Sequence, residues 1–183
     1  MLNIKNHWLT DATKISSPNF NDRPDENDIS LVVIHCISLP PNQFGGEYIA
    51  DLFCNCLNPN AHPYFQEIHT LQVSAHLMIR RDGECVQFVP FNKRAWHAGK
   101  SIFQERENCN DFSIGIELEG CETIAYTSTQ YEKLNAVLAV LFENYPDLKY
   151  VTGHSDIAPE RKTDPGASFE WSKIIYHGKV VPS

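Results

Sequence analysis

The chain has 183 residues, a length typical of one domain, and 42% of them are hydrophobic, which excludes wholesale disorder. Its 15 Lys and Arg against 23 Asp and Glu give a net charge of −8, so we expect no nucleic-acid partner and no membrane partner. The apolar runs are too short to span a bilayer, and the first residues have no pattern of a secretion signal. We therefore expect a cytoplasmic protein, and a monomer.

The first part of the chain is polar and then strongly apolar. Residues 1–30 contain prolines and an acidic run, which predicts an irregular arm packed on a domain formed by residues 31–183. Residues 31–37 are apolar and rich in β-branched side chains, as in a buried central strand. Helical spacing follows over 47–57. An Asp-Gly turn at 82–83 then predicts a hairpin, and its strands cover 74–80 and 84–89.

The second half contains the most regular helical pattern. A long loop is expected over 90–112, and a strand over 113–119 alternates apolar residues with glycine and glutamates. Thr129 and Glu132 form a capping box ahead of an amphipathic helix that ends at Pro146. The remaining expected elements are a strand at 150–154, a loop at 155–166 and a helix at 169–176. These elements predict a single α/β domain with a central mixed sheet flanked by helices.

Six cysteines could form disulfides, but the chain is not a short secreted scaffold, so reduced thiols are favoured. They are Cys36, Cys54, Cys56, Cys85, Cys109 and Cys121.

Three polar residues stand where strands end or loops stiffen. His35 lies near the end of the first long strand, His154 ends a later strand, and Asp164 precedes a proline that favours an extended backbone. Two histidines and an aspartate are suitable ligands for one zinc ion, with a fourth position left for water. Taken one by one, each residue is better explained as a hydrogen-bonded core histidine or a solvated turn aspartate.

Several stretches resemble the zinc N-acetylmuramoyl-L-alanine amidases, a family that includes the peptidoglycan recognition proteins. They run in order along most of the chain and comprise Val33–Pro41, Ser74–His76, Arg80–Gly83, Arg94–Gly99, Asn110–Glu119, Val151–His154, Asp156–Pro159 and Arg161–Gly166. The resemblance is to cytosolic members that act in bacterial cell-wall recycling.

The resemblance implies both a reaction and roles for individual residues. His35, His154 and Asp164 match the ligands of one zinc ion, Glu117 the catalytic carboxylate, and Lys162 the cation beside the metal. The implied reaction is hydrolysis of the amide between the lactyl group of 1,6-anhydro-N-acetylmuramic acid and L-alanine, in a small soluble muropeptide. Glu117 would move the protons and Lys162 would stabilise the oxyanion.

The stem peptide of such a substrate carries carboxylates, so an acidic protein would need a local group of cations. The candidate substrate contacts are Trp96, Arg94, Arg106 and Arg161, with Trp96 either stacking on a sugar or packing in the core. Three positions depart from the family pattern, where an asparagine and two arginines are usual: Cys36, Gln72 and Asn108.

Two other functions remain open. A muropeptide-binding module without catalysis is one alternative, although the ligand residue types are all present. A cysteine hydrolase with Cys36 beside His35 is the other, but adjacent strand residues point to opposite faces. We expect Glu119, two residues after Glu117, to be an exposed strand carboxylate.

Overall fold

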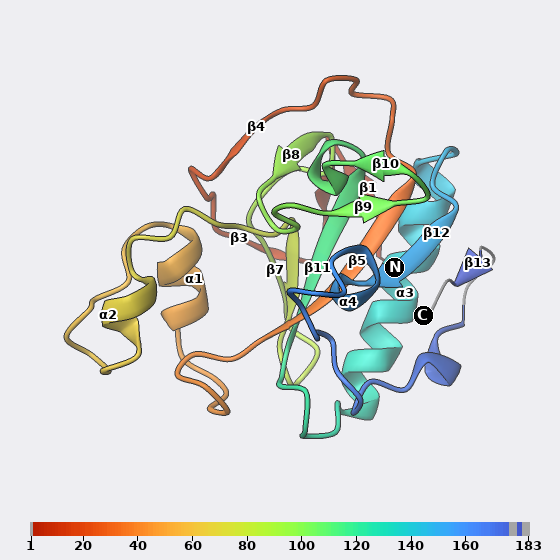
Figure 1. Ribbon diagram of the computed structural model, residues 1–183. Coiled ribbons are helices and arrows are strands. Elements are labelled where there is room, and N and C mark those ends of the chain that lie inside the picture. Colours follow the sequence, from red (N-terminus) through yellow and green to blue (C-terminus); the bar gives the residue numbers. More distant parts are fainter. Residues whose placement is uncertain (1, 176–178, 181–183) are drawn as a thin grey trace.

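The protein, described here from a computed structural model over residues 2–175 and 179–180, is built around one seven-stranded sheet (Figure 1). The strand order is β13-β12-β5-β11-β6-β7-β3. All neighbouring pairs are parallel except β6 and β7, which form an antiparallel hairpin. The predicted α/β fold with a central mixed sheet is confirmed. The strands of the sheet are β3 (Thr13–Lys14), β5 (Leu31–Ile37), β6 (Leu77–Ile79), β7 (Cys85–Gln87), β11 (Ser113–Glu119), β12 (Tyr150–Gly153) and β13 (Lys179–Val180).

The two long central strands, β5 and β11, place functional candidates next to each other. They run parallel, and their register aligns His35 with Glu117. Strand β12 lies on the other side of β5 and ends at Gly153, directly before His154. Because side chains alternate along a strand, one face of this region is apolar and the other carries the polar candidates.

The apolar face is covered by the long helix α3 (Ser128–Asn144), which lies along the sheet in Figure 1. Leucines and a valine of α3 pack on alternate residues of β5 and β11 to form the main core. The opposite face packs against the segment 98–112 and against α4 (His154–Ile157). The main core includes Val32, Ile34, Ile114, Ile116, Leu134, Val137, Leu138 and Leu141.

The cap of α3 differs from the prediction. Thr127, not Thr129, accepts the N–H of Gln130, and the Gln130 side chain accepts the N–H of Thr127. The pair Thr127 and Gln130 and the pair Thr129 and Glu132 both match the capping pattern. Gln130, however, is fully buried and also donates to the carbonyls of Ile79 and Glu119. These bonds to the sheet select the earlier start, and Glu132 remains exposed.

The segment predicted to be an irregular arm contains four short strands. β3 adds to the edge of the main sheet, and β4 (Phe20–Asp22) pairs with β8 (Lys93–Ala95). β1 (Ile4–Lys5) and β2 (Trp8–Leu9) form a small hairpin. The loop expected over 90–112 likewise holds β8, β9 (Ile102–Phe103) and β10 (Arg106–Glu107). Short strands of two or three residues are too brief to leave a periodic signal in the sequence.

The shorter helices differ most from expectation. The helix predicted over 47–57 is α1 (Tyr48–Phe53), and α2 (Phe65–Ile68) and α4 were not predicted. Within the described part of the helix predicted over 169–176, only a 3₁₀ turn forms at Trp171–Lys173, and residue 176 lies outside the described residues. The Asn135 side chain bonds the backbone of Lys173 and Ile175, so these groups are satisfied without a helix.

The cysteines and the helices bear on the sequence predictions of reduced thiols and of no membrane span. Each of the six cysteines is a free thiol. None of the helices in the described part of the chain is both long and apolar enough to traverse a lipid bilayer.

Candidate metal centre and catalytic cavity

Three segments converge to bring His35, His154 and Asp164 together. His35 comes from β5, His154 follows the neighbouring strand β12, and Asp164 lies in the loop after α4. Both histidines are almost fully buried, at 2% and 3% exposure. The one-turn helix α4 is started by Asp156, whose carboxylate accepts the N–H of Gly153. This cap turns the chain sharply after β12 and directs His154 toward β5.

The three side chains meet through one atom each. His35 Nδ1 lies 3.0 Å from His154 Nδ1 and 3.0 Å from Asp164 Oδ2, and His154 Nδ1 lies 3.1 Å from the same oxygen. The predicted residues therefore form a group that could hold a metal ion. A triangle of this size is close to one face of the tetrahedral nitrogen and oxygen set preferred by zinc, where ligand atoms lie about 3.3 Å apart.

The outer nitrogens of both imidazoles are also occupied. His154 Nε2 lies 3.1 Å from the carbonyl oxygen of Ala98, so this nitrogen donates a proton and Nδ1 keeps a lone pair. His35 Nε2 lies 2.9 Å from His97 Nδ1. Metal-binding histidines commonly have such a partner on the second nitrogen, because it fixes the orientation of the ring.

The charges in this group favour a cation. Burial lowers the pKa of His35 to about 4, so the imidazole is neutral at physiological pH. Burial acts to raise the pKa of Asp164, but the close approach of the His154 and His35 rings to its Oδ2, at 3.1 and 3.0 Å, outweighs burial and holds that pKa well below its ordinary value. Two neutral imidazoles and one carboxylate are the protonation states that a divalent metal requires.

Glu117 lies beside this group with one oxygen unpartnered. Its side chain is 8% exposed, and Oε2 is buried without a hydrogen-bond partner among the described residues. Burial raises the pKa of Glu117 well above its ordinary value, the charge of Asp164 adds to this effect, and Lys162 opposes it. A buried carboxyl group with a free oxygen and a raised pKa is suited to proton transfer.

A cavity of about 320 Å³ opens over these side chains. Lys162, Trp96 and Glu117 line it. So do His35, His154 and Asp164, which together form the candidate metal group. Trp96 is half-buried and donates from Nε1 to Asn21 Oδ1 at 2.7 Å, which holds its ring at the wall. The rest of the lining is mostly apolar and includes Leu39, Tyr64, Ile68, Leu71 and Val73.

The three predicted arginines do not line this cavity. Arg94 pairs with Asp111, and Arg106 pairs with Asp28 while stacking on Phe112. Each cation is thus engaged with a neighbouring carboxylate of the protein itself.

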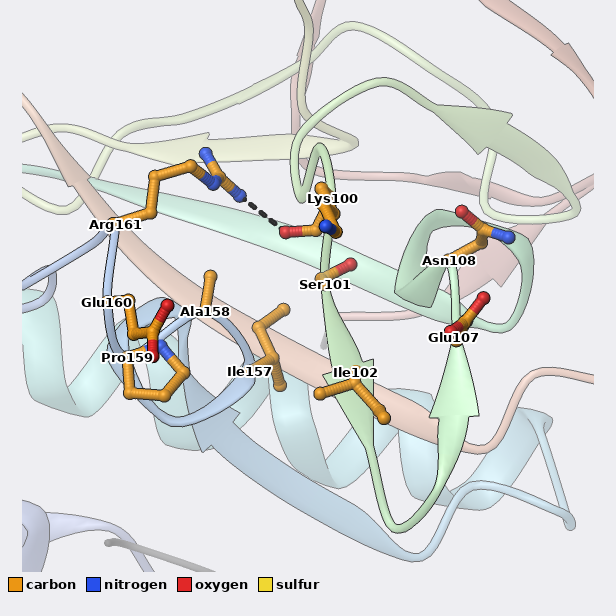
Figure 2. A pocket seen from close by; sticks show the side chains of 10 residues that line it. All are labelled: Lys100, Ser101, Ile102, Glu107, Asn108, Ile157, Ala158, Pro159, Glu160 and Arg161. Carbon is orange, nitrogen blue, oxygen red and sulfur yellow. Dashed lines mark hydrogen bonds between the residues drawn. The ribbon is translucent and has the colours of Figure 1, made fainter.

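Arg161 borders a second cavity, of about 490 Å³, between α4 and the β9–β10 hairpin (Figure 2). Its guanidinium donates to the carbonyls of Ala98 and Lys100, at 2.7 and 2.8 Å. Asn108, one of the positions that depart from the family pattern, lies on the opposite side of the same cavity in Figure 2.

Glu119 and Cys36 are both shielded from solvent, Glu119 almost fully and Cys36 in part. Glu119 is not exposed: it is 2% accessible, and its oxygens accept the backbone N–H groups of Gly45 and Arg81. The loop that folds over the end of β11 buries it, which the alternation of the strand could not reveal. Burial also raises the pKa of the Cys36 thiol to about 12, which disfavours a thiolate nucleophile at that position.

Comparison with known proteins adds independent information. The N-acetylmuramoyl-L-alanine amidase family matches residues 25–167. The chain is 57% identical over 177 residues to the 1,6-anhydro-N-acetylmuramyl-L-alanine amidase AmpD of Citrobacter freundii, covering 96% of this chain and 94% of that protein. A crystal structure of a selenomethionine AmpD derivative, also 57% identical, superposes with a TM-score of 0.92 and covers 95% of this chain and 97% of that one. AmpDh3 of Pseudomonas aeruginosa, solved in complex with anhydromuramic pentapeptide, has a TM-score of 0.57 at 26% identity, covering 82% and 60%.

Proposed function

The chain belongs to the N-acetylmuramoyl-L-alanine amidase family, and on that premise we propose that it is a zinc-dependent hydrolase of 1,6-anhydro-muropeptides. The bond cleaved is the amide between the lactyl group of 1,6-anhydro-N-acetylmuramic acid and L-alanine, in cell-wall recycling. The observation that carries the proposal is the convergence of His35 Nδ1, His154 Nδ1 and Asp164 Oδ2, beside a buried carboxyl group with a free oxygen.

One zinc ion would be held by His35, His154 and Asp164. When bound, zinc supplies Lewis-acid chemistry, since it polarises a carbonyl group and makes a water molecule acidic near neutral pH. The residues present fit this ion because their converging atoms are two imidazole nitrogens and one carboxylate oxygen.

Glu117 would perform the proton transfers of the reaction. Its free Oε2 takes a proton from the attacking water, and the same oxygen then delivers that proton to the amine of the departing L-alanine. A raised pKa suits both halves of this transfer, because the carboxyl group must hold the proton between the two steps. Lys162 lines the same cavity, where its ammonium group would stabilise negative charge on the oxygen of the cleaved amide.

The apolar wall of the cavity suits the sugar end of the substrate. Trp96, Tyr64 and Leu71 expose ring and methyl surface toward the cavity, and such surface binds the less polar face of a sugar. With Arg94 and Arg106 engaged elsewhere, Lys162 is the cation that lines the cavity in the described part of the chain. We propose a monomeric, cytoplasmic enzyme whose partner is the small muropeptide alone.

The proposal is tested with a defined 1,6-anhydro-muropeptide and mass analysis of the products. The zinc-loaded protein should release anhydro-N-acetylmuramic acid and a peptide with a free L-alanine amine. Removal of metal with a strong chelator should abolish release, and added zinc should restore it. Full turnover by metal-free protein would reject the zinc mechanism, and binding without turnover by the zinc-loaded protein would favour a binding module.

A further inference from the structure

The imidazole of His97 lies against the outer nitrogen of His35. The two rings meet edge to face at 83°, with 2.9 Å between His97 Nδ1 and His35 Nε2. The second nitrogen of His97, Nε2, lies 3.2 Å from Ser113 Oγ. His97 thus connects a proposed metal ligand to a serine at the start of β11.

The hydrogen bond that Ser113 makes with the backbone decides which atom donates in each of these contacts. Ser113 Oγ lies 2.6 Å from the carbonyl oxygen of Cys109, and a carbonyl oxygen can only accept, so the hydroxyl proton points there. Toward His97, Ser113 Oγ then presents lone pairs alone, and His97 Nε2 must donate. In a neutral His97 this leaves Nδ1 without a proton, able to accept from His35 Nε2–H.

The same direction follows from the metal end. His35 can bind a cation through Nδ1 only if its proton is on Nε2. The proton on Nε2 needs an acceptor, and His97 Nδ1 is the atom within hydrogen-bond distance. The two ends of the connection therefore require the same tautomer of His35.

The fold makes specific room for this ring. A Cβ atom at Gly115 would lie 2.4 Å from Cγ of His97, so a residue with a side chain would displace the imidazole. The backbone on either side is held by Asn110, whose Oδ1 accepts the N–H groups of His97 and Ala98 at 3.1 and 2.8 Å. The position of the ring is thus set by its own loop and by the strand beneath it.

We propose that His97, oriented by Ser113, is a positioning residue that fixes the proton of His35 on Nε2 and thereby prepares His35 Nδ1 to bind zinc. The neighbouring Ala98 carbonyl acts in the same way on His154, so one short segment sets both imidazoles. This inference rests on the zinc site of the proposed function. It adds that tight zinc binding requires His97 as well as the three ligands.

The tautomer can be read directly in the full-length, zinc-free protein. Long-range ¹H–¹⁵N correlation spectra at neutral pH distinguish a proton on Nε2 from one on Nδ1, and the His35 signals are assigned with His35→Gln. The parental protein should carry the His35 proton on Nε2. In His97→Leu this preference should be lost. A parental His35 with its proton on Nδ1 overturns the proposal, as does a tautomer that is the same in His97→Leu.

Zinc affinity provides the second measurement, by competition with a chromophoric chelator. His97→Leu should bind zinc roughly ten- to a hundredfold more weakly. His97→Asn, which is similar in size but can place an oxygen near the position of Nδ1, should recover most of the affinity. Equal affinities of the Leu variant and the parental protein contradict the proposal, as do equal losses in Leu and Asn.

Ser113→Ala tests the same connection if His97→Leu does not fold. It should lower zinc affinity by a smaller factor and populate the second tautomer of His35. Ser101→Ala is the matched control, because it removes a buried hydroxyl that bonds the backbone of Gly99 and Cys109 but touches neither imidazole. An effect of equal size in both serine variants would contradict the proposal. Neither readout measures turnover, so these results stand apart from whether the amidase reaction is found.

Discussion

Glu117 and Glu119 show how two identical residues on one strand face acquire different roles. Both point to the same side of β11, yet Glu119 has its oxygens paired with backbone N–H groups, whereas one oxygen of Glu117 has no partner among the residues that the structure describes. A carboxylate that is fully paired is held in place and contributes to stability. A buried carboxyl group with a free oxygen can exchange a proton with a bound molecule.

We predict that Glu117→Gln retains its zinc and loses roughly a hundredfold or more in turnover, because the amide cannot accept the water proton. Metal content and kcat are measured on the same preparation. Glu119→Gln is the matched control, and it should lower the unfolding free energy with a much smaller effect on kcat. Near-parental turnover in a zinc-loaded Glu117→Gln protein would mean that another group moves the proton.

His76 gives a pH dependence that does not involve His35, His154 or Asp164. It is fully buried, accepts the N–H of Gly115 at Nδ1 and lies 2.9 Å from the Lys93 carbonyl at Nε2. Burial lowers its pKa to about 3, and the charge of Arg23 acts in the same direction. In the unfolded chain its pKa is about 6.5.

The sign of the effect follows from these two values. Above pH 6.5 the His76 imidazole is neutral in both states; between pH 6.5 and about 3 only the unfolded chain binds the proton, so stability falls as the pH falls. We predict that His76→Gln, whose amide can donate to the Lys93 carbonyl, has a shallower loss of unfolding free energy between pH 6 and 4. The difference should approach about 1.4 kcal/mol per pH unit in urea titrations. If the unfolding free energies of the parental protein and of His76→Gln fall by the same amount between pH 6 and 4, the neutral buried state of His76 is contradicted.

At the scale of elements, one face of β11 supplies three alternate residues that shape the candidate site. Ser113 orients His97, Gly115 leaves room for its ring, and Glu117 faces the cavity. The period of two that puts Ile114, Ile116 and Leu118 into the core therefore also spaces the polar groups. The sequence predicted the alternation along β11. It did not predict that the segment containing His97 packs on the polar face, because this depends on the path of the loop before the strand.

The start of α3 offers a test of which local signal decides a helix boundary. Thr127→Ala removes the side-chain oxygen that caps Gln130, so we predict a loss of about 1 kcal/mol in the free energy of unfolding. Thr129→Ala, at the exposed position where the sequence pattern placed the cap, should change stability by a few tenths of a kcal/mol at most. Chemical denaturation of the two variants checks this, and a larger loss at Thr129 would contradict the observed cap.

At the scale of the whole molecule, Arg23 attaches the N-terminal segment to the region of the candidate site. This guanidinium is 4% exposed and donates to the carbonyls of four residues in the segment that precedes and begins β11. Burial lowers the pKa of Arg23 to about 10, which still leaves it charged at neutral pH. The acceptors are Phe91, Asn110, Asp111 and Ser113.

We predict that Arg23→Met lowers the free energy of unfolding by at least about 3 kcal/mol, because several buried carbonyl groups lose their donor. Lys5→Met, an exposed change in the same N-terminal segment, should be close to neutral. Thermal and urea unfolding measure both. A small effect of Arg23→Met would show that the N-terminal segment is only loosely attached to the site.

The sequence predicted the metal group better than it predicted the surroundings. His35, His154 and Asp164 were found through their motifs, and a sheet built from strands at 31–37, 113–119 and 150–154 was readable from apolar patterns. The arginines could not be assigned, because whether Arg94 faces a substrate or Asp111 depends on tertiary contacts. The same holds for Glu119, which is covered by a loop distant in sequence.

The central claim is that His35, His154 and Asp164 together hold one zinc ion. X-ray diffraction at the zinc absorption edge, from crystals of the zinc-loaded protein, tests it most directly. The account predicts a single strong anomalous peak about 2.0–2.2 Å from His35 Nδ1, His154 Nδ1 and the Asp164 carboxylate. A peak at other side chains, or no peak at these three in protein that contains zinc, would contradict it.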